Sequence, residues 1–113
     1  MLSVVIPVMN EEDNIAPMLS GLGEALKSLK HEIIFVDDGS SDDTIKNIVK
    51  AKQSNVRLLE FARNYGQTSA MAAGIEAALG DYVVTLDGDL QNDPSDIPVM
   101  LEKLKKENKE LLQ

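Results

Sequence analysis

Two aspartates near the C-terminal end of the chain have the type and spacing that a metal site needs. Asp87 and Asp89 follow the apolar run 82–86, which predicts a buried β-strand. Residues spaced by two in extended backbone project to the same side, so the two carboxylates are predicted to share one face. Such a pair suits a hard divalent cation, Mg²⁺ or Mn²⁺, which can hold nucleotide phosphates. Gln91 adds a third oxygen, and Pro94 fixes the exit of the segment.

A pair of aspartates this close together also occurs in solvated turns and helix caps. The position of Asp87 and Asp89 directly after a strand favours the metal site over that interpretation. An EF-hand loop does not explain the spacing, because Asn92 stands where that loop needs glycine. Pro98 stands where the same loop needs its bidentate glutamate.

Size and charge limit what the chain can bind. Its 113 residues indicate one domain, and 43% hydrophobic with 27% charged residues is ordinary for a soluble globular protein. A net charge of -8 argues against a nucleic-acid partner and against docking on anionic lipid through this domain alone. The sequence has no cysteine and no run near the roughly 18 apolar residues of a membrane span. We expect a cytoplasmic location, or the cytoplasmic face of a membrane if the chain is part of a longer one.

Strand and helix patterns alternate from the first residue. Apolar runs predict strands at 2–8, 32–36, 57–61 and 82–86. Helical spacing predicts helices at 15–29, 44–52 and 67–79 and from 95 or 96 onward. Asn10 or Asp13 is expected to cap the first helix, Gly80 to end the third, and Val49 and Met100 to face inward. These repeated units predict an α/β fold with a Rossmann-like, mostly parallel sheet and helices on both faces.

Polar residues gather where the four predicted strands end. Right-handed crossovers place the carboxyl ends of parallel strands at one edge of the sheet, where ligands of such folds bind. The polar segments at that edge are 7–12, 37–40, 62–67 and 87–89. The segments at the opposite edge look like ordinary connecting loops. The sequence therefore predicts a binding site at one edge only.

Several side chains at this edge have more than one interpretation. Asp37 and Asp38 could accept hydrogen bonds from a nucleobase or from ribose hydroxyls, or they could belong to a simple capped turn. Pro7 cannot donate to a strand ladder, which fits either an edge bulge or a rigid wall against a base. Arg63 is either a partner for a diphosphate or a solvated surface arginine.

Several catalytic motifs are missing from the sequence. No G-x-G-x-x-G follows the first strand, so a dinucleotide-binding Rossmann domain would lack its phosphate turn. No G-x-x-x-x-G-K-[ST] occurs, which excludes a P-loop NTPase. One histidine and no cysteine cannot build a Ser–His–Asp or Cys–His set. A receiver-type domain is disfavoured as well, because its acid pair would follow the first strand.

Four motifs in order resemble those of the family 2 glycosyltransferases of GT-A fold, and they lie at 4–11, 36–40, 63–67 and 86–91. The resemblance covers nearly the whole chain. It is strongest to the branch that transfers sugars to polyprenyl phosphates, such as dolichyl-phosphate and undecaprenyl-phosphate sugar transferases. It implies the N-terminal half of a GT-A fold, with a nucleoside-diphosphate sugar as donor and a polyprenyl phosphate as acceptor.

The resemblance also implies roles for individual residues. The nucleoside pocket would be lined by Pro7, Met9 and Glu11. The base-reading carboxylate would be one of the pair Asp37 and Asp38, and Asp87 would contact the donor. Mg²⁺ or Mn²⁺ on the diphosphate would be held by Asp87, Asp89 and Gln91.

The expected chemistry is an inverting, metal-dependent sugar transfer. A cation on the diphosphate would stabilise the charge that develops on the leaving group. A lipid phosphate, with a second pKa of about 6, is largely ionised at neutral pH and needs little help from a general base. A sugar hydroxyl would need such a base, and the sequence identifies none. This difference favours the lipid-phosphate acceptor.

The chain departs from the family pattern in two ways. Gly88 stands where alanine is commoner, a change expected to cost the site nothing obvious. Family members continue well beyond the aspartate pair, so we expect 1–113 to be a truncated GT-A domain that mainly binds the donor and is incomplete for catalysis. Its open sheet edge would then take a missing strand or a second copy of the chain. The alternative is a non-catalytic nucleotide-binding or oligomerisation module.

Overall fold

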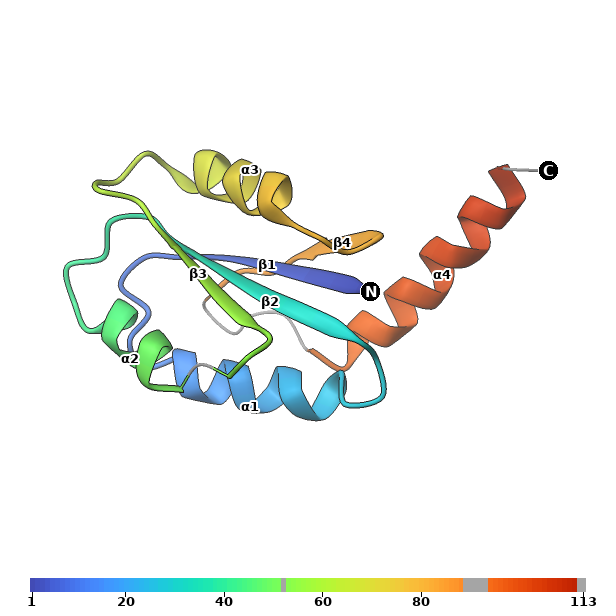
Figure 1. The fold of residues 1–113 in the computed structure, drawn as a ribbon, viewed down its shortest axis with the longest axis horizontal. Helices are drawn as coiled ribbons and strands as arrows, with labels where there is room; N and C mark the ends of the chain where they lie inside the picture. Colours follow the sequence, from blue (N-terminus) through green and yellow to red (C-terminus); the bar gives the residue numbers. More distant parts are fainter. Residues whose placement is uncertain (52, 89–93, 112–113) are drawn as a thin grey trace.

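The computed structural model describes residues 1–51, 53–88 and 94–111, and in these residues four strands alternate with four helices (Figure 1). The strands are β1 (Leu2–Val8), β2 (His31–Asp37), β3 (Val56–Glu60) and β4 (Tyr82–Thr85). The helices are α1 (Ile15–Ala25), α2 (Thr44–Ala51), α3 (Gln67–Ala77) and α4 (Asp96–Leu111).

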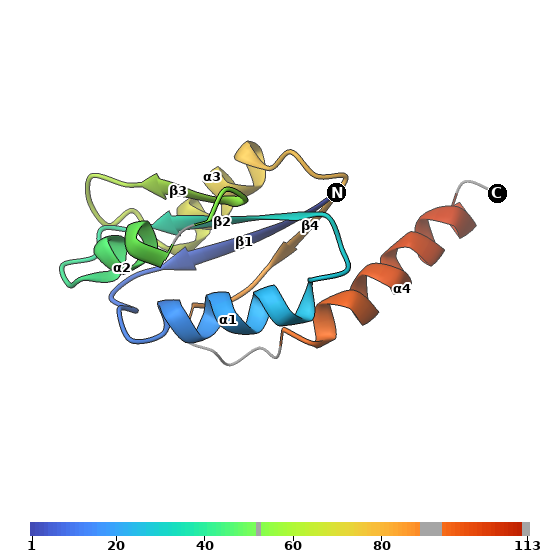
Figure 2. The same ribbon diagram turned by 60° about the horizontal axis from the view of Figure 1, so that its bottom comes forward.

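The strands form one parallel sheet in the order β3-β2-β1-β4. Helix α3 covers one face, whereas α1 and α2 cover the other (Figures 1 and 2). Helix α4 starts beside α1 and then projects away from the body of the domain in both views. The predicted α/β fold with a parallel sheet between helices is confirmed. All strand carboxyl ends therefore lie at one edge, as the site prediction requires.

Alternation of side chains along β1 builds a core on each face of the sheet. Every residue of β1 is buried, because the strand pairs on both sides and is covered on both faces. Its even-numbered positions pack toward α1, together with Ile15, Met18 and Leu22 of that helix. Val5 packs toward α3 against Ala70. The short strand period thus explains why the run 2–8 is almost continuously apolar.

The ends of two helices differ from the prediction. Asn14, rather than Asn10 or Asp13, occupies the position before α1, and its side chain makes no cap hydrogen bond. Helix α3 ends at Ala77, and the next residue, Ala78, is already extended. The helix therefore ends before Gly80. The N–H of Gly80 instead donates to the Ser3 hydroxyl at 2.9 Å. A tertiary contact thus accounts for this glycine.

Two apolar residues expected to face inward are exposed. Val49 is 58% exposed, because α2 has only eight residues and contacts the core through Ile48. Met100 is 43% exposed, whereas Ile97 of the same helix is buried as predicted. No helix in the described part of the chain combines the length and apolar character needed to cross a membrane.

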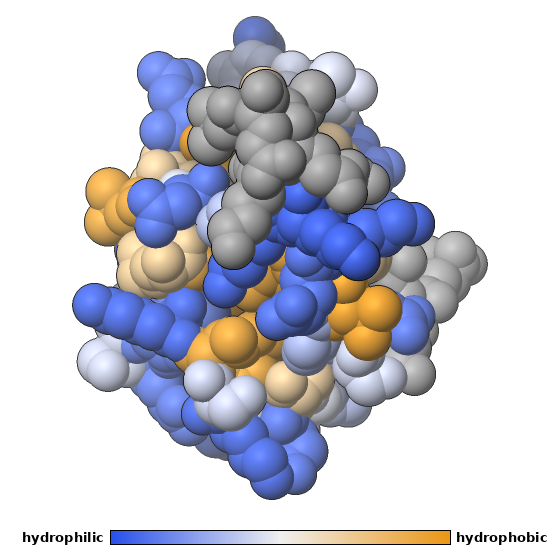
Figure 3. All heavy atoms as spheres, turned by 90° about the vertical axis from the view of Figure 1, so that its right-hand side faces the viewer, coloured by the Kyte–Doolittle hydropathy of each residue, from blue (hydrophilic) through white to orange (hydrophobic). Residues whose placement is uncertain are grey.

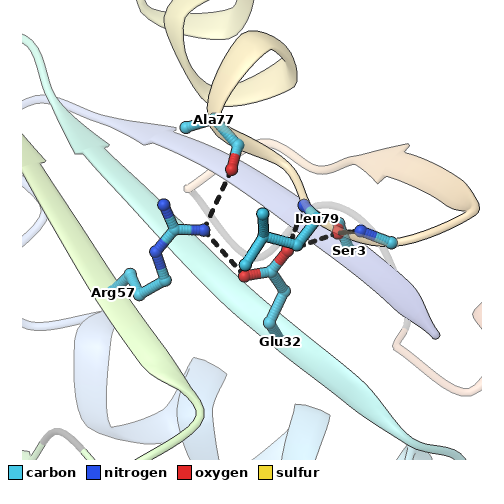
Figure 4. Close-up of polar contacts among 6 residues, drawn as sticks. Ser3, Glu32, Arg57, Ala77 and Leu79 are labelled. Atoms are coloured by element: carbon cyan, nitrogen blue, oxygen red, sulfur yellow. Dashed lines mark hydrogen bonds and ion pairs between the residues drawn. The ribbon is translucent and has the colours of Figure 1, made fainter.

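The amino edge of the sheet carries a buried carboxylate and is more than plain connection (Figure 4). Glu32 accepts hydrogen bonds from the Ser3 hydroxyl at 2.6 Å and the Leu79 N–H at 2.7 Å. Arg57 forms an ion pair with Glu32 at 2.8 Å and also donates to the carbonyl of Ala77 at 3.0 Å. The network therefore ties β1, β2 and β3 to the end of α3.

Burial by itself would raise the pKa of the Glu32 carboxyl. The hydrogen bonds from Ser3, Leu79 and Arg57 and the guanidinium charge outweigh burial, so the pKa lies below its ordinary value of 4.5. A carboxylate whose pKa is lower in the folded state than in the unfolded state stabilises the fold above the unfolded pKa. That stabilisation is lost as the pH falls through the folded pKa.

We predict that Glu32→Gln lowers the free energy of unfolding at pH 7 by roughly 2 kcal/mol, because an amide cannot accept all of these bonds. The difference from wild type should shrink as the pH falls below 4.5, since the wild type then loses the same contribution. Urea unfolding at several pH values measures both effects. Glu24→Gln, in an exposed pair with Lys27, is the control and should change little. A stability difference that stays constant from neutral to acid pH would contradict the role of the carboxylate.

Candidate functional site

Hydrogen bonds join the loop after β1 to the loop after β2. The N–H of Asn10 donates to Ser40 Oγ at 2.9 Å, and Asn10 Oδ1 accepts the N–H of Ser41 at 2.8 Å. The next N–H, that of Glu11, donates to Thr44 Oγ1 at 2.9 Å. Asn10 itself has a left-handed φ of 55°, which asparagine tolerates better than most residues. These bonds fix the backbone that presents the Glu11 side chain.

Asp42 strengthens the same junction. Its carboxylate accepts hydrogen bonds from the N–H and hydroxyl of Thr44 and from the N–H of Glu12. Burial alone would raise the pKa of Asp42, but these hydrogen bonds outweigh burial and hold the pKa below its usual value. Asp42 is therefore ionised at neutral pH and holds the start of α2 against the first loop.

The predicted acid pair Asp37 and Asp38 is buried, with exposures of 0% and 5%. Asp37 accepts hydrogen bonds from the N–H and the hydroxyl of Ser40. Asp38 accepts the N–H of Tyr65 at 2.7 Å and the N–H of Gly66 at 3.0 Å. Asp37 thus binds its own loop, as in the capped-turn interpretation, whereas Asp38 binds the loop that leads into α3. Whether either one also reads a base stays a prediction.

A hollow of about 260 Å³ lies where β1, α3 and β4 meet, and it is lined by Glu11, Gln67, Asp87 and Gly88. Gln67 Nε2 donates to Asp87 Oδ1 at 3.0 Å. On the opposite wall, Glu11 Oε2 accepts the side-chain amide of Asn14 at 2.6 Å. The structure thus brings together Glu11 and Asp87, two residues predicted from the sequence at the ends of neighbouring strands.

Gln67 was missed as an individual site residue. It is the first residue of α3 and belongs to the motif 63–67, in which only Arg63 was considered as a separate site residue. Its position as a polar residue at a helix start on the ligand-binding edge was the available signal. The predicted ligands Asp89 and Gln91 lie outside the described residues.

Pro7 makes no bulge. The carbonyl of Val5 accepts the N–H of Leu86 on the β4 side. Backbone polar groups point to the same side at every second residue of a strand, so the nitrogen of Pro7 also faces β4. Pairing of β1 with β4 ends at Val5 and Thr85, and the missing N–H of Pro7 therefore removes no ladder bond. The other interpretation, a rigid wall against a base, stays a prediction.

Two further predicted residues are exposed at this edge. Met9 is 42% exposed, and the side-chain amide of Asn64 contacts its sulfur. The guanidinium of Arg63 lies over the ring of Tyr65, 4.9 Å from its centroid. Tyr65 in turn meets Phe61 edge to face. Arg63 is thus a surface residue stacked on an aromatic ring, and a contact of Arg63 with a diphosphate stays a hypothesis.

The opposite end of the molecule faces the viewer in Figure 3, with hydrophobic residues at the centre of the face and hydrophilic ones around them. A hollow of about 230 Å³ there is lined mainly by leucines, Tyr82 and lysines. Among its described lining residues the carboxylate is Asp81, which is paired with the N-terminal amine. The hollow at the carboxyl edge differs, because there Asp87 is hydrogen-bonded to the Gln67 amide and Glu11 lines the same space. A parallel sheet with such an edge is typical of ligand-binding α/β domains.

The chain belongs to glycosyl transferase family 2, because the model of that family matches residues 3–113. It is 45% identical over 116 residues to dodecaprenyl-phosphate galacturonate synthase of Rhizobium johnstonii, covering 98% of this chain and 34% of that protein. It is 44% identical over 107 residues to undecaprenyl-phosphate 4-deoxy-4-formamido-L-arabinose transferase of Klebsiella pneumoniae, covering 90% and 33%. Both relatives are polyprenyl-phosphate sugar transferases, and the chain spans about a third of their length.

Solved structures share the GT-A fold. TarS (residues 1–349) of S. aureus, solved with UDP, matches with a TM-score of 0.77 at 23% identity, over 93% of this chain and 32% of that one. Glucosyl-3-phosphoglycerate synthase of Mycobacterium tuberculosis, solved with UDP, matches with a TM-score of 0.69 at 28% identity, over 87% and 37%. The mannosyltransferase PcManGT of Pyrobaculum calidifontis, solved with GDP-Man and Mn²⁺, gives 0.72 at 23%, over 84% and 29%. The predicted fold and enzyme family are thus confirmed.

Gly88 is buried against the end of β1, in a place with little room for a side chain. A Cβ at Gly88 would lie 2.9 Å from Val8 Cγ1 and 3.2 Å from the Pro7 carbonyl oxygen. The segment after β4 can therefore pass this close to β1 only without a side chain. The tight contact sets the position of Asp87, the preceding residue.

We predict that Gly88→Ala destabilises the fold by about 1–3 kcal/mol, because the added methyl group overpacks the contact with β1. Urea unfolding measures this change. Gly23→Ala is the matched control, since a Cβ at that helical position would meet nothing within 4 Å. It should stabilise by up to about 1 kcal/mol through helix propensity. Wild-type stability in Gly88→Ala would show that the segment after β4 relaxes freely.

Proposed function

We propose that this chain binds the nucleoside-diphosphate sugar for an inverting, metal-dependent transfer to a polyprenyl phosphate. The convergence of Glu11, Gln67 and Asp87 around one hollow at the carboxyl edge carries this proposal. The domain boundaries predicted from the sequence follow from it, with 1–113 as the donor-binding part of a GT-A domain.

The donor atoms at the hollow suit a hard divalent cation. Asp87 and Glu11 supply carboxylate oxygens, which Mg²⁺ and Mn²⁺ prefer. Within the described residues, no three His, Cys, Asp or Glu side chains are placed to hold a metal together. We therefore assign the metal to Asp87 with Asp89 and Gln91, while diphosphate oxygens and water complete a shell of about six ligands. The cation would stabilise negative charge on the leaving diphosphate.

The nucleoside of the donor would lie along the end of β1. Pro7, which is buried in β1, and the exposed Met9 would lie along this path, and Glu11 would lead from it into the hollow. The acid pair Asp37 and Asp38 lies at the end of the neighbouring strand β2. We retain the pair as the proposed source of the base-reading carboxylate. Their buried contacts also hold the loops that surround the path.

A polyprenyl phosphate is the acceptor that the chemistry favours. Its ionised oxygen would attack the anomeric carbon of the sugar as the bond from that carbon to the diphosphate breaks, which inverts the configuration. Such an oxygen needs no general base at neutral pH, since the second pKa of a phosphate monoester is about 6. The only histidine, His31, lies at the amino edge and contacts Asn55. The polyprenyl-phosphate transferases among the relatives support the same acceptor.

In the described residues the sheet has two edge strands, β3 and β4, and β4 lies next to the central strand β1. The outer backbone groups of β4 could pair with a strand from a longer chain or from a second copy. A polyprenyl phosphate lies in a membrane, so the proposal places the protein at the cytoplasmic face of a membrane whenever an acceptor is engaged. The membrane location depends on the acceptor assignment, whereas the pairing of β4 does not.

We predict that the chain binds UDP- or GDP-sugars only with Mn²⁺ or Mg²⁺ present. Asp87→Asn should weaken this binding at least about tenfold, because it removes a charged ligand from the cation. Calorimetric titration with and without Mn²⁺ measures the effect. Glu76→Gln is the matched control, because it also removes one negative charge and lies at the exposed far end of α3.

Binding that does not depend on the metal would contradict the site, as would equal losses in Asp87→Asn and Glu76→Gln. If neither sugar nucleotide binds, the chain is not a donor-binding module. Metal-dependent binding without transfer to a polyprenyl phosphate would agree with a donor-binding part that needs further residues for catalysis.

A further inference from the structure

Gln67 is the only side chain of α3 that lines the hollow in the described part of the chain. Its Nε2 donates to Asp87 Oδ1 at 3.0 Å across the space between α3 and the end of β4. A hydrogen-bond donor held against one carboxylate oxygen limits rotation of the whole carboxylate. Such outer hydrogen bonds orient metal-ligating carboxylates in general. Gln67 is therefore placed to set how Asp87 faces the hollow.

The start of α3 is itself fixed by Asp38. The carboxylate is 5% exposed and accepts the N–H groups of Tyr65 and Gly66, the two residues that precede the helix. Bonds from backbone donors to a buried carboxylate are short and strong because the acceptor is charged. The negative charge also faces the positive end of the helix dipole. Asp38 therefore anchors the residues directly before Gln67.

The loops on either side of this anchor are in tight contact. Gly39 follows Asp38, and a Cβ on it would lie 2.6 Å from the N of Asn64 and 2.7 Å from the carbonyl carbon of Arg63. Its φ of 80° is also in the left-handed region, where a side chain is strained. The turn after β2 thus packs directly on the backbone that leads into α3.

The far end of α3 is fastened as well. Arg57 donates to the carbonyl of Ala77, the last helical residue, and Glu32 accepts the N–H of Leu79. A helix held at both ends cannot slide along its axis by the 1.5 Å that separates successive residues. Its first residue therefore has a fixed distance to Asp87.

We propose that Asp38 and Gln67 are positioning residues for Asp87. Asp38 holds the start of α3, and Gln67 at that start orients the Asp87 carboxylate for the donor complex. Asp38 then acts through the helix, and its effect on donor binding needs no contact with the base. The proposal rests on the proposed function for its binding consequences, whereas the orientation of Asp87 can be measured without any ligand.

The first experiment follows the ¹³C signal of the Asp87 side-chain carboxyl by NMR, assigned with Asp87→Asn. The signal should shift in Gln67→Ala, in Gln67→Met and in Asp38→Asn. Gln67→Met keeps the approximate length of the side chain but carries no charge and cannot donate, so it separates hydrogen bonding from packing. The control Thr68→Ala changes an exposed residue in the same turn and should leave the signal in place. An unchanged Asp87 signal in the Gln67 variants would overturn the proposal.

The second experiment measures Mn²⁺ affinity by electron paramagnetic resonance, with UDP and separately with GDP. Both Gln67 variants should bind Mn²⁺ about tenfold more weakly than wild type, and Thr68→Ala should match wild type. The Gln67 variants should unfold within about 3 °C of wild type, because an exposed side chain adds little stability. Wild-type Mn²⁺ affinity in Gln67→Ala would overturn the proposal.

Asp38→Asn distinguishes positioning from direct contact with the base. If Asp38 acts through α3, hydrogen exchange at the amides of Tyr65 and Gly66 should speed up and the Asp87 signal should shift. If Asp38→Asn weakens nucleotide binding while exchange and the Asp87 signal stay as in wild type, Asp38 contacts the nucleoside and the proposal is wrong. If the wild-type chain binds neither nucleotide in the presence of Mn²⁺, the proposed function is wrong, but the positioning roles are not yet contradicted. The Asp87 signal would still decide the positioning roles.

Discussion

The parallel pairing of β1 with both β2 and β4 is the interaction on which the rest of the structure depends. It places β1 in the middle of the sheet, buries it from both faces, and aligns the carboxyl ends of three strands at one edge. Glu11 after β1 and Asp87 after β4 meet around one hollow for that reason. Burial of β1 excludes polar residues from most of its length, and polar residues return as soon as the strand ends.

Two buried carboxylates at opposite edges of the sheet perform related tasks. Glu32 at the amino edge binds the end of α3, and Asp38 at the carboxyl edge binds the residues before its start. Glu32 accepts the N–H of Leu79 just beyond the last turn of α3, and Asp38 accepts the N–H groups of the two residues just before its first turn. Burial of each charge is offset by several hydrogen bonds, as the lowered pKa of Glu32 indicates. The helix that carries Gln67 is thereby held from both ends.

The sequence predicted the features that follow from local patterns. Apolar runs located the strands, and the family resemblance assigned the motifs at their ends. Contacts that depend on tertiary packing could not be predicted in this way. Nothing local shows that Asp38 reaches Tyr65 and Gly66, or that Gly88 passes close to Val8. Ser3 and Glu32 were visible as polar residues in apolar strands, but their shared contact depends on strand register.

We propose that the hollow between Glu11, Gln67 and Asp87 holds the metal diphosphate of a sugar donor. Crystals of the chain grown with Mn²⁺ and UDP or GDP would locate the metal through the anomalous signal of manganese. A manganese peak at about 2.0–2.3 Å from an Asp87 oxygen, with the diphosphate beside it, is the predicted result. A nucleotide bound at another edge of the sheet, or a manganese ion remote from Asp87, would contradict the assignment.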